Sequence, residues 1–524
     1  MNKYIMAVDD GTTGIRAIIF DKNANIVAQS YEKVSQYFPH PGWCEQDGNK
    51  VWEKCLLVMR KVLQSSKINP DQISAIGVSS QRSSNLLWDK TSGKPVYNVI
   101  TWQDTRTADI CSQKDNAFKM KSIRAVGKFT KAISSVAKGI RKTTSGARLI
   151  TTATLSFPTA SSLAHTRWML DNVGKAKEIM KKGNLLTGTI DTWLIWNLTG
   201  GKVHATDYSN ASSTGMFDSF KLQWSNFFLD LFDVSSEILP EVFETNGDYG
   251  FTGKELLGSE VPIRCSVADQ QSALFAEGCI HPGDVKLTNG TGSFIDMNVG
   301  YKPAPSLHKL IPLVAWRINN RTSYMLEGMV NTTGSAVQWL KENLSIIDDE
   351  DDTEKMANKV EDTGGAYFVP AFTGLSSPYW DPHASGIVIG LNRRTTKDHI
   401  VRAALEGIVY RCKDVLQAIE KSSGIHISSI KADGGASKNN FLLQFMADML
   451  DVSVERPVML DGTALGAAYF AGLGSGYWET VDDLLKTRKL DKTFTPMMKE
   501  EKRKQLYSGW KEAVNRSLMW QGGI

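Results

Sequence analysis

The sequence has few cysteines and lacks any long hydrophobic run. Six of 524 residues are cysteine and no two of them form a C-x-x-C pair, which indicates reduced thiols rather than disulfides or a zinc site. No stretch of about 18 apolar residues is present, so we expect no transmembrane helix. The first residues enter a strand-like segment without the apolar core of a signal peptide, so we expect a cytoplasmic protein.

Two common phosphate-binding motifs are also missing. No G-x-x-x-x-G-K-[ST] sequence occurs, which excludes a P-loop enzyme. The glycine-rich loop and H-R-D pattern of protein kinases are absent too. The eight histidines are scattered and form no metal-binding cluster. Any nucleotide chemistry must therefore use a different kind of loop.

The length and composition are those of a globular protein with more than one core. A chain of 524 residues exceeds one ordinary core, so we predict domains at 1–249 and 250–524. Hydrophobic residues make up 42% and charged residues 22% of the chain, as in soluble globular proteins. Strand-like runs mixed with helical periodicity predict an α/β protein whose mixed sheets are covered by helices.

One segment holds most of the positive charge. The chain has a net charge of +4, but residues 111–150 combine ten basic residues with the single acid Asp115, so the remainder is acidic. We therefore expect no nucleic-acid binding by the whole chain. The basic residues are Lys114, Lys119, Lys121, Arg124, Lys128, Lys131, Lys138, Arg141, Lys142 and Arg148.

Apolar residues recur through this basic insert, about residues 112–150, at steps of three to five positions. Two interpretations fit the pattern. The insert is either an ordinary solvated helix packed on its own domain, or a basic amphipathic helix that contacts an anionic membrane or a partner. The apolar residues are Phe118, Ile123, Val126, Phe129, Ile133, Val136 and Ile140.

Two short segments share the pattern of strand, glycine-threonine turn and strand. The first turn contains Gly11, Thr12 and Thr13, and the second is Gly290–Gly292. Backbone N–H groups and threonine hydroxyls at such turns can hold a phosphate. We infer two related halves that grip one polyphosphate. Asp9, just before the first turn, either holds Mg²⁺ or hydrogen-bonds its own turn.

Two further turns are candidates for chemistry. Asp269 follows an apolar strand and precedes a helix, so it is either a helix cap or a base that accepts a proton from a substrate hydroxyl. Gly434 and Gly435 lie between a strand and a helix, where a flat ligand such as an adenine ring can approach closely. A plain strand-to-helix turn has the same appearance.

These elements, in this order, resemble the FGGY carbohydrate kinases, and the likeness covers nearly the whole chain. The pattern Gly386–Leu391, seven further residues and then His399–Glu406 is similar to the second signature of the family. The glycerol kinase branch fits best, through segments such as Pro41–Asp47 and Thr206–Ser212. Within the glycerol kinase branch, the basic insert and the sequence of residues 267–273 are similar to those of a divergent animal subgroup.

The resemblance implies an actin-like, ribonuclease H-like ATPase fold that clamps ATP and Mg²⁺ between two domains. It implies ATP-dependent phosphorylation of glycerol to sn-glycerol 3-phosphate, with Asp269 as the base and Asp9 at the metal. Nucleotide-binding positions are implied at Thr12, Thr13, Arg16, Thr291, Gly334, Gln338, Gly435 and Asn439. Positions around glycerol are implied at Arg82, Trp102, Asp269, Gln270 and Phe294. A homodimer is one arrangement that it allows.

The chain departs from the family pattern at three positions. Ser83 stands where glycerol kinases have a glutamate that binds substrate hydroxyls, Ala160 aligns with a tyrosine, and His165 replaces a lysine of the first signature. Losing a charged hydrogen bond of roughly 1.5–3 kcal/mol would weaken glycerol binding by about 10- to 150-fold. A kinase for another small polyol or sugar, and a non-catalytic ATP-binding scaffold, therefore stay open as alternatives.

Overall fold

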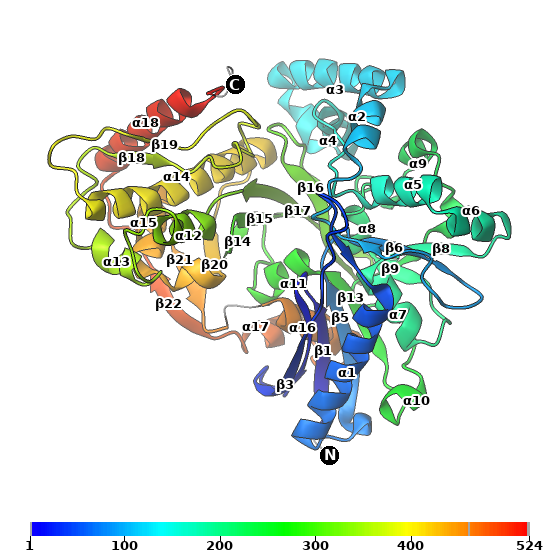
Figure 1. The fold of residues 1–524 in the computed structure, drawn as a ribbon. Helices are drawn as coiled ribbons and strands as arrows, with labels where there is room; N and C mark the ends of the chain where they lie inside the picture. The colour runs from blue at the N-terminus through cyan, green and yellow to red at the C-terminus, as the bar shows by residue number, and fades with distance from the viewer. Residues whose placement is uncertain (1–2, 460–461, 521–524) are drawn as a thin grey trace.

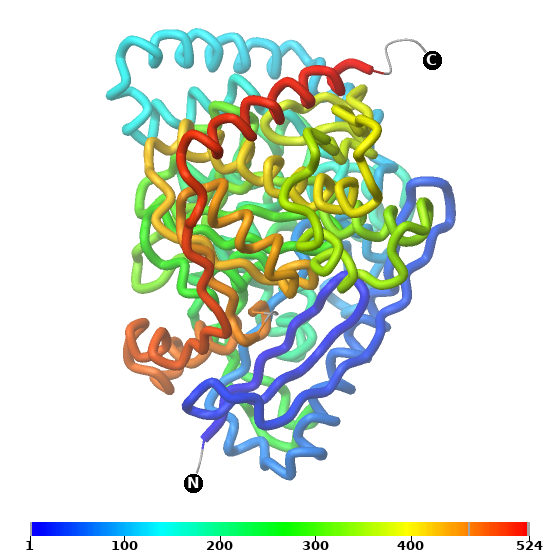
Figure 2. The backbone as a smooth tube through the Cα atoms, turned by 90° about the vertical axis from the view of Figure 1, so that its left-hand side faces the viewer, coloured from blue at the N-terminus to red at the C-terminus, as the bar shows by residue number. Residues whose placement is uncertain are grey.

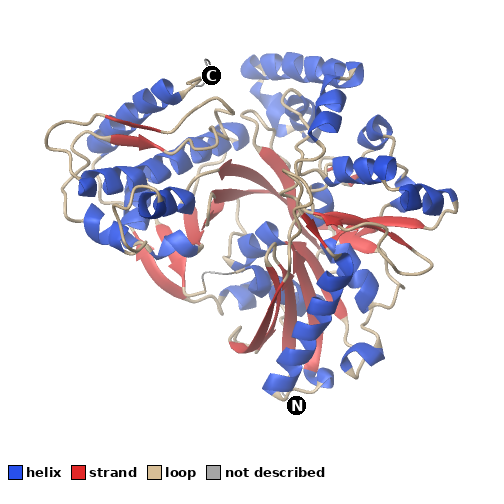
Figure 3. Ribbon diagram, viewed as in Figure 1, coloured by secondary structure: helices blue, strands red, loops and turns tan. Residues whose placement is uncertain are grey.

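The computed structural model describes residues 3–459 and 462–520, which fold into two lobes, each built on its own sheet (Figure 1). Strands and helices alternate through both lobes, as Figure 3 shows. The two chain ends lie at opposite ends of the molecule in both views (Figures 1 and 2). The predicted fold class, mixed sheets covered by helices, is confirmed.

The N-terminal lobe has a five-stranded sheet in the order β13-β5-β1-β2-β3. Alternate side chains of β1 point to opposite faces. Met6 and Val8 belong to one core with helix α1, whereas Ile5 and Ala7 belong to another with α16. A sheet buried on both faces results, because helices cover each side. The bounds are β1 Tyr4–Asp10, β2 Gly14–Phe20, β3 Ile26–Lys33, β5 Ile73–Ser80, β13 Ile263–Ala268, α1 Gly48–Ser66 and α16 Thr463–Gly474.

The C-terminal lobe has a seven-stranded sheet in the order β16-β17-β15-β14-β20-β21-β22. The 27-residue helix α14 and helix α15 pack in its largest core. The bounds are β14 Asp284–Asn289, β15 Ser293–Gly300, β16 Ile311–Ile318, β17 Arg321–Val330, β20 Ser429–Asp433, β21 Val454–Pro457, β22 Leu490–Phe494, α14 Lys397–Ser423, α15 Asn440–Leu450 and α18 Glu500–Ser517.

The two sheets repeat one arrangement. β1 is antiparallel to β2 and parallel to β5, and β14 is likewise antiparallel to β15 and parallel to β20. Each hairpin turn contains a backbone bond from its first glycine: Gly11 N–H donates to the Gly14 carbonyl at 3.0 Å, and Gly290 N–H donates to the Gly292 carbonyl at 2.9 Å. The prediction of two related halves is therefore confirmed at the level of strand arrangement.

The remaining elements extend the N-terminal lobe and cover the C-terminal one. A four-stranded sheet has the order β4-β7-β6-β8. The basic insert forms α2, α3 and α4 with a short 3₁₀ segment between the last two, where we expected one helix. The principal bounds are β4 Glu45–Gln46, β6 Asn85–Asp89, β7 Val99–Ile100, β8 Leu185–Thr189, α2 Ala108–Asn116, α3 Phe118–Val136, α4 Thr144–Thr152, α5 Ser162–Asn172, α6 Gly174–Lys181, α7 Ile190–Leu198, α8 Tyr208–Ser212, α11 Asp269–Ala276, α12 Gly334–Glu342 and α13 Asp352–Ala357.

Helix α16, from the last part of the chain, packs closely against the sheet of the N-terminal lobe. Helix α16 lies against β5, where a Cβ atom on Gly77 would lie 2.2 Å from the carbonyl oxygen of Ala467. Only glycine fits at this contact. Strand β13 pairs with β5, so it belongs to the N-terminal sheet. The domain boundary at 249/250 stays a prediction.

All six cysteines are free and buried. Within the described part of the chain, no helix has both the length and the apolar content needed to cross a membrane.

Candidate active site

Three adjacent parallel strands of the N-terminal sheet end side by side. In the register of this sheet, Asp10 of β1 and Ala268 of β13 both lie opposite Ser80 of β5. The residues that follow these strand ends therefore gather at one edge, where α/β proteins place their sites. Arg82 and Asp269 are among them.

Asp269 lies in an ion pair at this edge. Its Oδ1 is 3.4 Å from Nε of Arg82 and also accepts a bond of 2.7 Å from the Gln270 N–H. Asp269 is the first residue of α11 and Ala268 is the cap residue, so the helix-cap interpretation does not describe its position. Burial raises the pKa of Asp269, while the cations of Arg82 and Lys286 oppose this shift.

Arg82 also joins the two lobes. Its Nη2 lies 2.7 Å from Oε2 of Glu327, which belongs to β17 of the C-terminal sheet. Both side chains are largely buried, with 14% and 6% of their surface exposed. A short, shielded pair of opposite charges holds its geometry more firmly than an exposed one. The edge that carries Asp269 therefore faces the C-terminal sheet.

Asp9 and Asp10 occupy different environments although they are neighbours. Asp9 accepts bonds of 2.8 and 2.7 Å from Nε and Nη2 of Arg16, so the two residues predicted at the metal and the phosphates contact each other. Asp10 is buried, and Oδ2 accepts a bond of 3.3 Å from Gln81. Burial, together with the charges of Asp9 and Asp269, raises the pKa of Asp10 to about 8.

The first glycine-threonine turn contacts a residue predicted near the acceptor. Nε1 of Trp102 donates to Oγ1 of Thr12 at 3.0 Å, and Gln46 donates to the Thr12 carbonyl at 2.8 Å. Thr13 is exposed, as is 39% of the Trp102 surface. The structure thus brings together the predicted nucleotide residue Thr12 and the predicted acceptor residue Trp102.

The second glycine-threonine turn packs against the start of α12. The Thr291 carbonyl accepts bonds from the N–H groups of Thr333 and Ser335, at 2.9 and 3.1 Å. A Cβ atom on Gly334 would lie 2.7 Å from the Gly290 carbonyl oxygen. The absence of a side chain at Gly334 is therefore needed for this contact. Thr291 itself is exposed.

The paired glycines lie beside this turn. Strand β20 ends at Asp433, opposite Thr288 of β14. Gly434 has φ +85°, and a Cβ there would lie 2.6 Å from the Asn289 carbonyl oxygen. Gly435 is exposed, and no other atom lies within 4 Å of the position a Cβ would take. The backbone at Gly435 is thus open to a ligand.

The side chains of two further predicted nucleotide residues are hydrogen-bonded within the C-terminal lobe. Asn439 caps α15 by accepting from the Leu442 N–H and donates to Thr353. Gln338 is exposed on α12 and donates to Glu342.

The acceptor side of the predicted site contains charges that sequence reasoning missed. Nζ of Lys286 donates to Oε1 of Gln270 at 2.6 Å and lies 2.9 Å from Oδ2 of Asp296. Phe294, two residues before Asp296 on β15, is partly buried. The sequence did offer one signal for these charges, since ionisable side chains stand in otherwise apolar strands. Such residues are rarely buried unless they are paired, so a buried ion pair could have been predicted.

The three departures from the family pattern have distinct environments. Ser83 has φ +65°, and its hydroxyl donates to the Ser213 carbonyl at 2.8 Å, a bond within the N-terminal lobe. His165 is buried, which lowers its pKa to about 4. Ala160 lies in the turn before α5.

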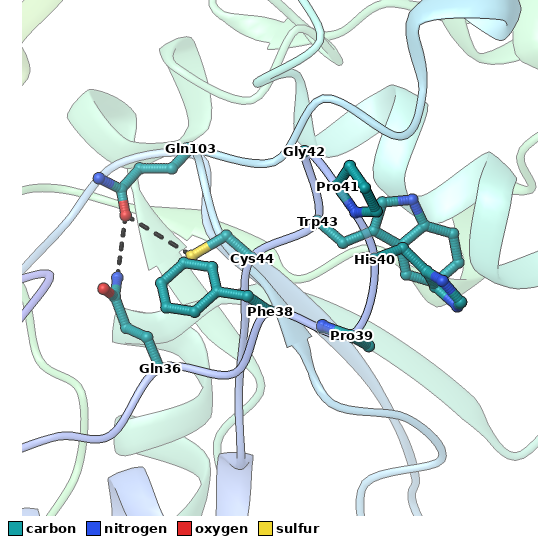
Figure 4. A pocket seen from close by; sticks show the side chains of 9 residues that line it. All are labelled: Gln36, Phe38, Pro39, His40, Pro41, Gly42, Trp43, Cys44 and Gln103. Carbon is teal, nitrogen blue, oxygen red and sulfur yellow. Dashed lines mark hydrogen bonds between the residues drawn. The ribbon is translucent and has the colours of Figure 1, made fainter.

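A surface cavity of about 530 Å³ is lined by other residues (Figure 4). The loop around Phe38 and Trp43 forms most of its wall, and Gln103 bonds to Gln36 across it. None of its lining residues is among those predicted for the site.

The chain belongs to the FGGY family of carbohydrate kinases. The N-terminal domain of this family matches residues 4–138 and 129–276, and the C-terminal domain matches residues 285–475. The predicted resemblance to the family is therefore confirmed. The two N-terminal matches overlap within the basic insert.

Similar proteins narrow the class further. "Glycerol kinase 2" of Thermotoga maritima is 45% identical over 520 residues, 99% of each chain, and the glycerol kinase of Caldanaerobacter subterraneus is 45% identical over 521. The Plasmodium falciparum glycerol kinase with ADP superposes with a TM-score of 0.89 at 31% identity, covering 99% of this chain and 98% of that one. The Lactobacillus acidophilus gluconate kinase, at 22% identity and a TM-score of 0.82, shares the fold. The animal-subgroup resemblance stays a prediction.

The open backbone at Gly435 generates a prediction for nucleotide binding. Gly435→Ala should leave the melting temperature unchanged, because its Cβ would meet no atom within 4 Å. If a nucleotide ring approaches this backbone, overpacking by about 1–3 kcal/mol should weaken ADP binding by about 5- to 150-fold. Titration calorimetry with ADP checks this, with Gly139→Ala as the matched control. Equal ADP affinity in both variants and wild type contradicts the predicted nucleotide position.

Proposed function

We propose that this chain transfers the terminal phosphoryl group of ATP to glycerol and forms sn-glycerol 3-phosphate. The observation that carries the proposal is the Asp269 carboxylate, which lies beside Arg82 where the two lobes meet. The full-length similarity to glycerol kinases supports glycerol as the acceptor.

In the proposed mechanism, Asp269 accepts the proton of the acceptor hydroxyl as its oxygen attacks the terminal phosphorus of ATP. The bond between this phosphorus and the leaving oxygen of ADP breaks on the side opposite the attacking hydroxyl oxygen. Burial raises the pKa of Asp269, which makes the carboxylate a better proton acceptor, while the positive charge of Arg82 favours its ionised form. The two glycine-threonine turns would donate N–H groups to the phosphate oxygens. Closure of the lobes would exclude water, which competes as an acceptor.

The residues at this edge suit a magnesium ion. Mg²⁺ prefers oxygen ligands and uses one or two carboxylates together with substrate phosphates. Asp9 supplies a carboxylate beside the first turn, and Oδ1 of the neighbouring Asp10 is a buried oxygen without a hydrogen-bond partner. Within residues 3–459 and 462–520 no group of three or more His, Cys, Asp or Glu side chains forms a complete metal site. We propose that Asp9 holds Mg²⁺, which would neutralise charge on the phosphates of bound ATP.

Ser83 favours a second candidate, a kinase for another small polyol or sugar. Its hydroxyl is bonded to the Ser213 carbonyl, so it does not replace the glutamate that glycerol kinases are expected to have there. Because Ser83 stands in place of the expected glutamate, a non-catalytic scaffold that binds ATP is the third candidate. An acceptor screen separates the three.

We expect ADP release from ATP and Mg²⁺ to depend on an added acceptor, with glycerol the best of a panel of polyols and sugars. Asp269→Asn should abolish this release, because proton acceptance typically contributes about 10²–10⁴-fold, and should leave ATP binding intact. A coupled ADP assay and calorimetry provide the two readouts.

Asp109→Asn is the matched control, because Asp109 is an exposed aspartate of α2 outside the site. A better acceptor than glycerol would favour the second candidate. ATP binding without turnover on any acceptor would favour the scaffold, and a fully active Asp269→Asn enzyme would contradict the proposed base.

We also propose a cytoplasmic location and a homodimer. The six free, buried thiols support a reducing compartment. The edge strand β3 and the loop after it expose apolar side chains that a second subunit could cover: Ile26, Val27, Tyr31, Tyr37 and Phe38. Light scattering should give twice the mass of one chain. The mass of a single chain, in an enzyme whose activity does not fall on dilution, would contradict the dimer.

Finally, we propose that helix α3 of the basic insert contacts an anionic membrane. Its inner face packs on the protein through Met120, Gly127 and Ser134, at seven-residue spacing. Its outer face exposes large apolar side chains, including 84% of Phe118 and 68% of Phe129. The helix lies at one end of the molecule in both views (Figures 1 and 2).

The charges of α3 favour lipid over a protein partner of mixed charge. The helix contains five basic residues and no acid, and Lys119, Lys121 and Lys128 are exposed beside the apolar stripe. Each lysine near an anionic surface contributes about 1 kcal/mol, and the apolar side chains add burial in the headgroup region. The remaining exposed apolar residues are Val126, Ile133 and Val136.

A flotation assay tests this contact with the full chain. Vesicles containing phosphatidylserine should carry the wild-type protein, whereas vesicles of phosphatidylcholine alone should carry much less. The triple variant Phe118→Ser, Phe129→Ser and Val136→Ser should lower the floated fraction strongly. Met497→Ser, which removes an exposed apolar side chain of the other lobe, should not. Equal flotation of the triple variant and wild type, or no flotation of either, contradicts the proposal.

A further inference from the structure

Three neighbouring strands of the C-terminal sheet place ionisable side chains in one row. Lys286 of β14 lies opposite Asp296 of β15, which in turn lies opposite Glu327 of β17. All three are buried, with at most 6% of a side chain exposed. Burying charges is costly unless they are paired, so such a row in a sheet indicates a specific use.

Each end of the row contacts a side chain predicted to bind the acceptor. Oε2 of Glu327 lies 2.7 Å from Nη2 of Arg82. At the other end, Nζ of Lys286 donates to Oε1 of Gln270 at 2.6 Å. Arg82 and Gln270 come from the N-terminal lobe, so the row belongs to one lobe and holds two side chains of the other.

We propose that Glu327 and Lys286, with Asp296 between them, are positioning residues that fix Arg82 and Gln270 for the acceptor. This inference rests on the proposed kinase function and extends it from the side chains predicted to bind the acceptor to the residues that hold them. The row itself is covered by Arg82 and Gln270 and is not predicted to touch the acceptor.

The charges around Glu327 make this support sensitive to pH. Arg82, from the loop after β5, and Asp296, from β15, face Glu327, and Asp269 and Lys286 lie behind them. Burial and the negative charge of Asp296 raise the pKa of Glu327 to about 7, while Arg82 opposes the shift. Above that pH the ionised carboxylate holds Arg82 in an ion pair, and below it the attraction weakens.

The Michaelis constant for the acceptor should therefore rise as the pH falls through about 7. Glu327→Gln removes the ionisable group, so this variant should behave at every pH like the wild type at acid pH. Because Arg82 loses a charged partner, the acceptor constant at pH 8 should rise by about 10- to 100-fold. The value of kcat should change less, since Asp269 remains.

Asp296→Asn should produce the opposite pH shift. Removing the negative charge beside Glu327 lowers the pKa of that glutamate, so the rise of the acceptor constant should begin at a more acid pH than in the wild type. The constant itself should be higher than in the wild type at every pH, because buried Lys286 loses its ion-pair partner. A role limited to packing would not move the pH profiles of the two variants in opposite directions. Glu361→Gln, an exposed glutamate of the same lobe, is the matched control and should match wild type.

The experiment measures kcat and the acceptor Michaelis constant from pH 5.5 to 9 for wild type and these variants, with melting temperatures beside them. If Glu327→Gln does not fold, Glu327→Asp and Asp296→Asn give the same test. If the wild type turns over the acceptor and the variants show the same acceptor constant and pH profile as the wild type, the positioning role is overturned. Absence of acceptor-dependent turnover in the wild type would instead overturn the proposed function, so the two failures are distinguishable.

Discussion

The buried ion pair between Arg82 and Glu327 is the contact on which the arrangement of the site depends. It joins the loop after β5 in one lobe to β17 in the other, and Arg82 extends from it to the Asp269 carboxylate. Removing one partner of such a pair leaves an unpaired buried charge, which costs about 3–5 kcal/mol. The relative position of the lobes and the ionisation of Asp269 are therefore linked through one guanidinium group.

The repeated sheet arrangement explains why the candidate residues converge from distant parts of the sequence. In each lobe, a hairpin turn projects from a strand whose other neighbour is parallel and ends at the same edge. This places Thr12 beside Trp102 in one lobe and Thr291 beside Gly334 in the other. Each lobe therefore carries one exposed glycine-threonine turn at corresponding places in its sheet, and we propose that both turns bind the phosphates of ATP.

Local patterns predicted much of the fold, and long-range contacts account for what was missed. The strands beside the two glycine turns, and the strand and helix on either side of Asp269, carry their own signals of period and turn chemistry. The row formed by Lys286, Asp296 and Glu327 has no such signal, because its members are adjacent only through sheet register. Helix α16 was missed for a related reason: it is apolar all round and returns to the first lobe, where Gly77 admits it.

A crystal structure with a non-hydrolysable ATP analogue, Mg²⁺ and glycerol tests the central claim most directly. The account predicts phosphate oxygens within hydrogen-bond distance of both glycine-threonine turns, Gly11–Thr13 and Gly290–Gly292, and a glycerol hydroxyl at the Asp269 carboxylate. A nucleotide held by one lobe only, or a glycerol bound away from Asp269 and Arg82, would contradict it.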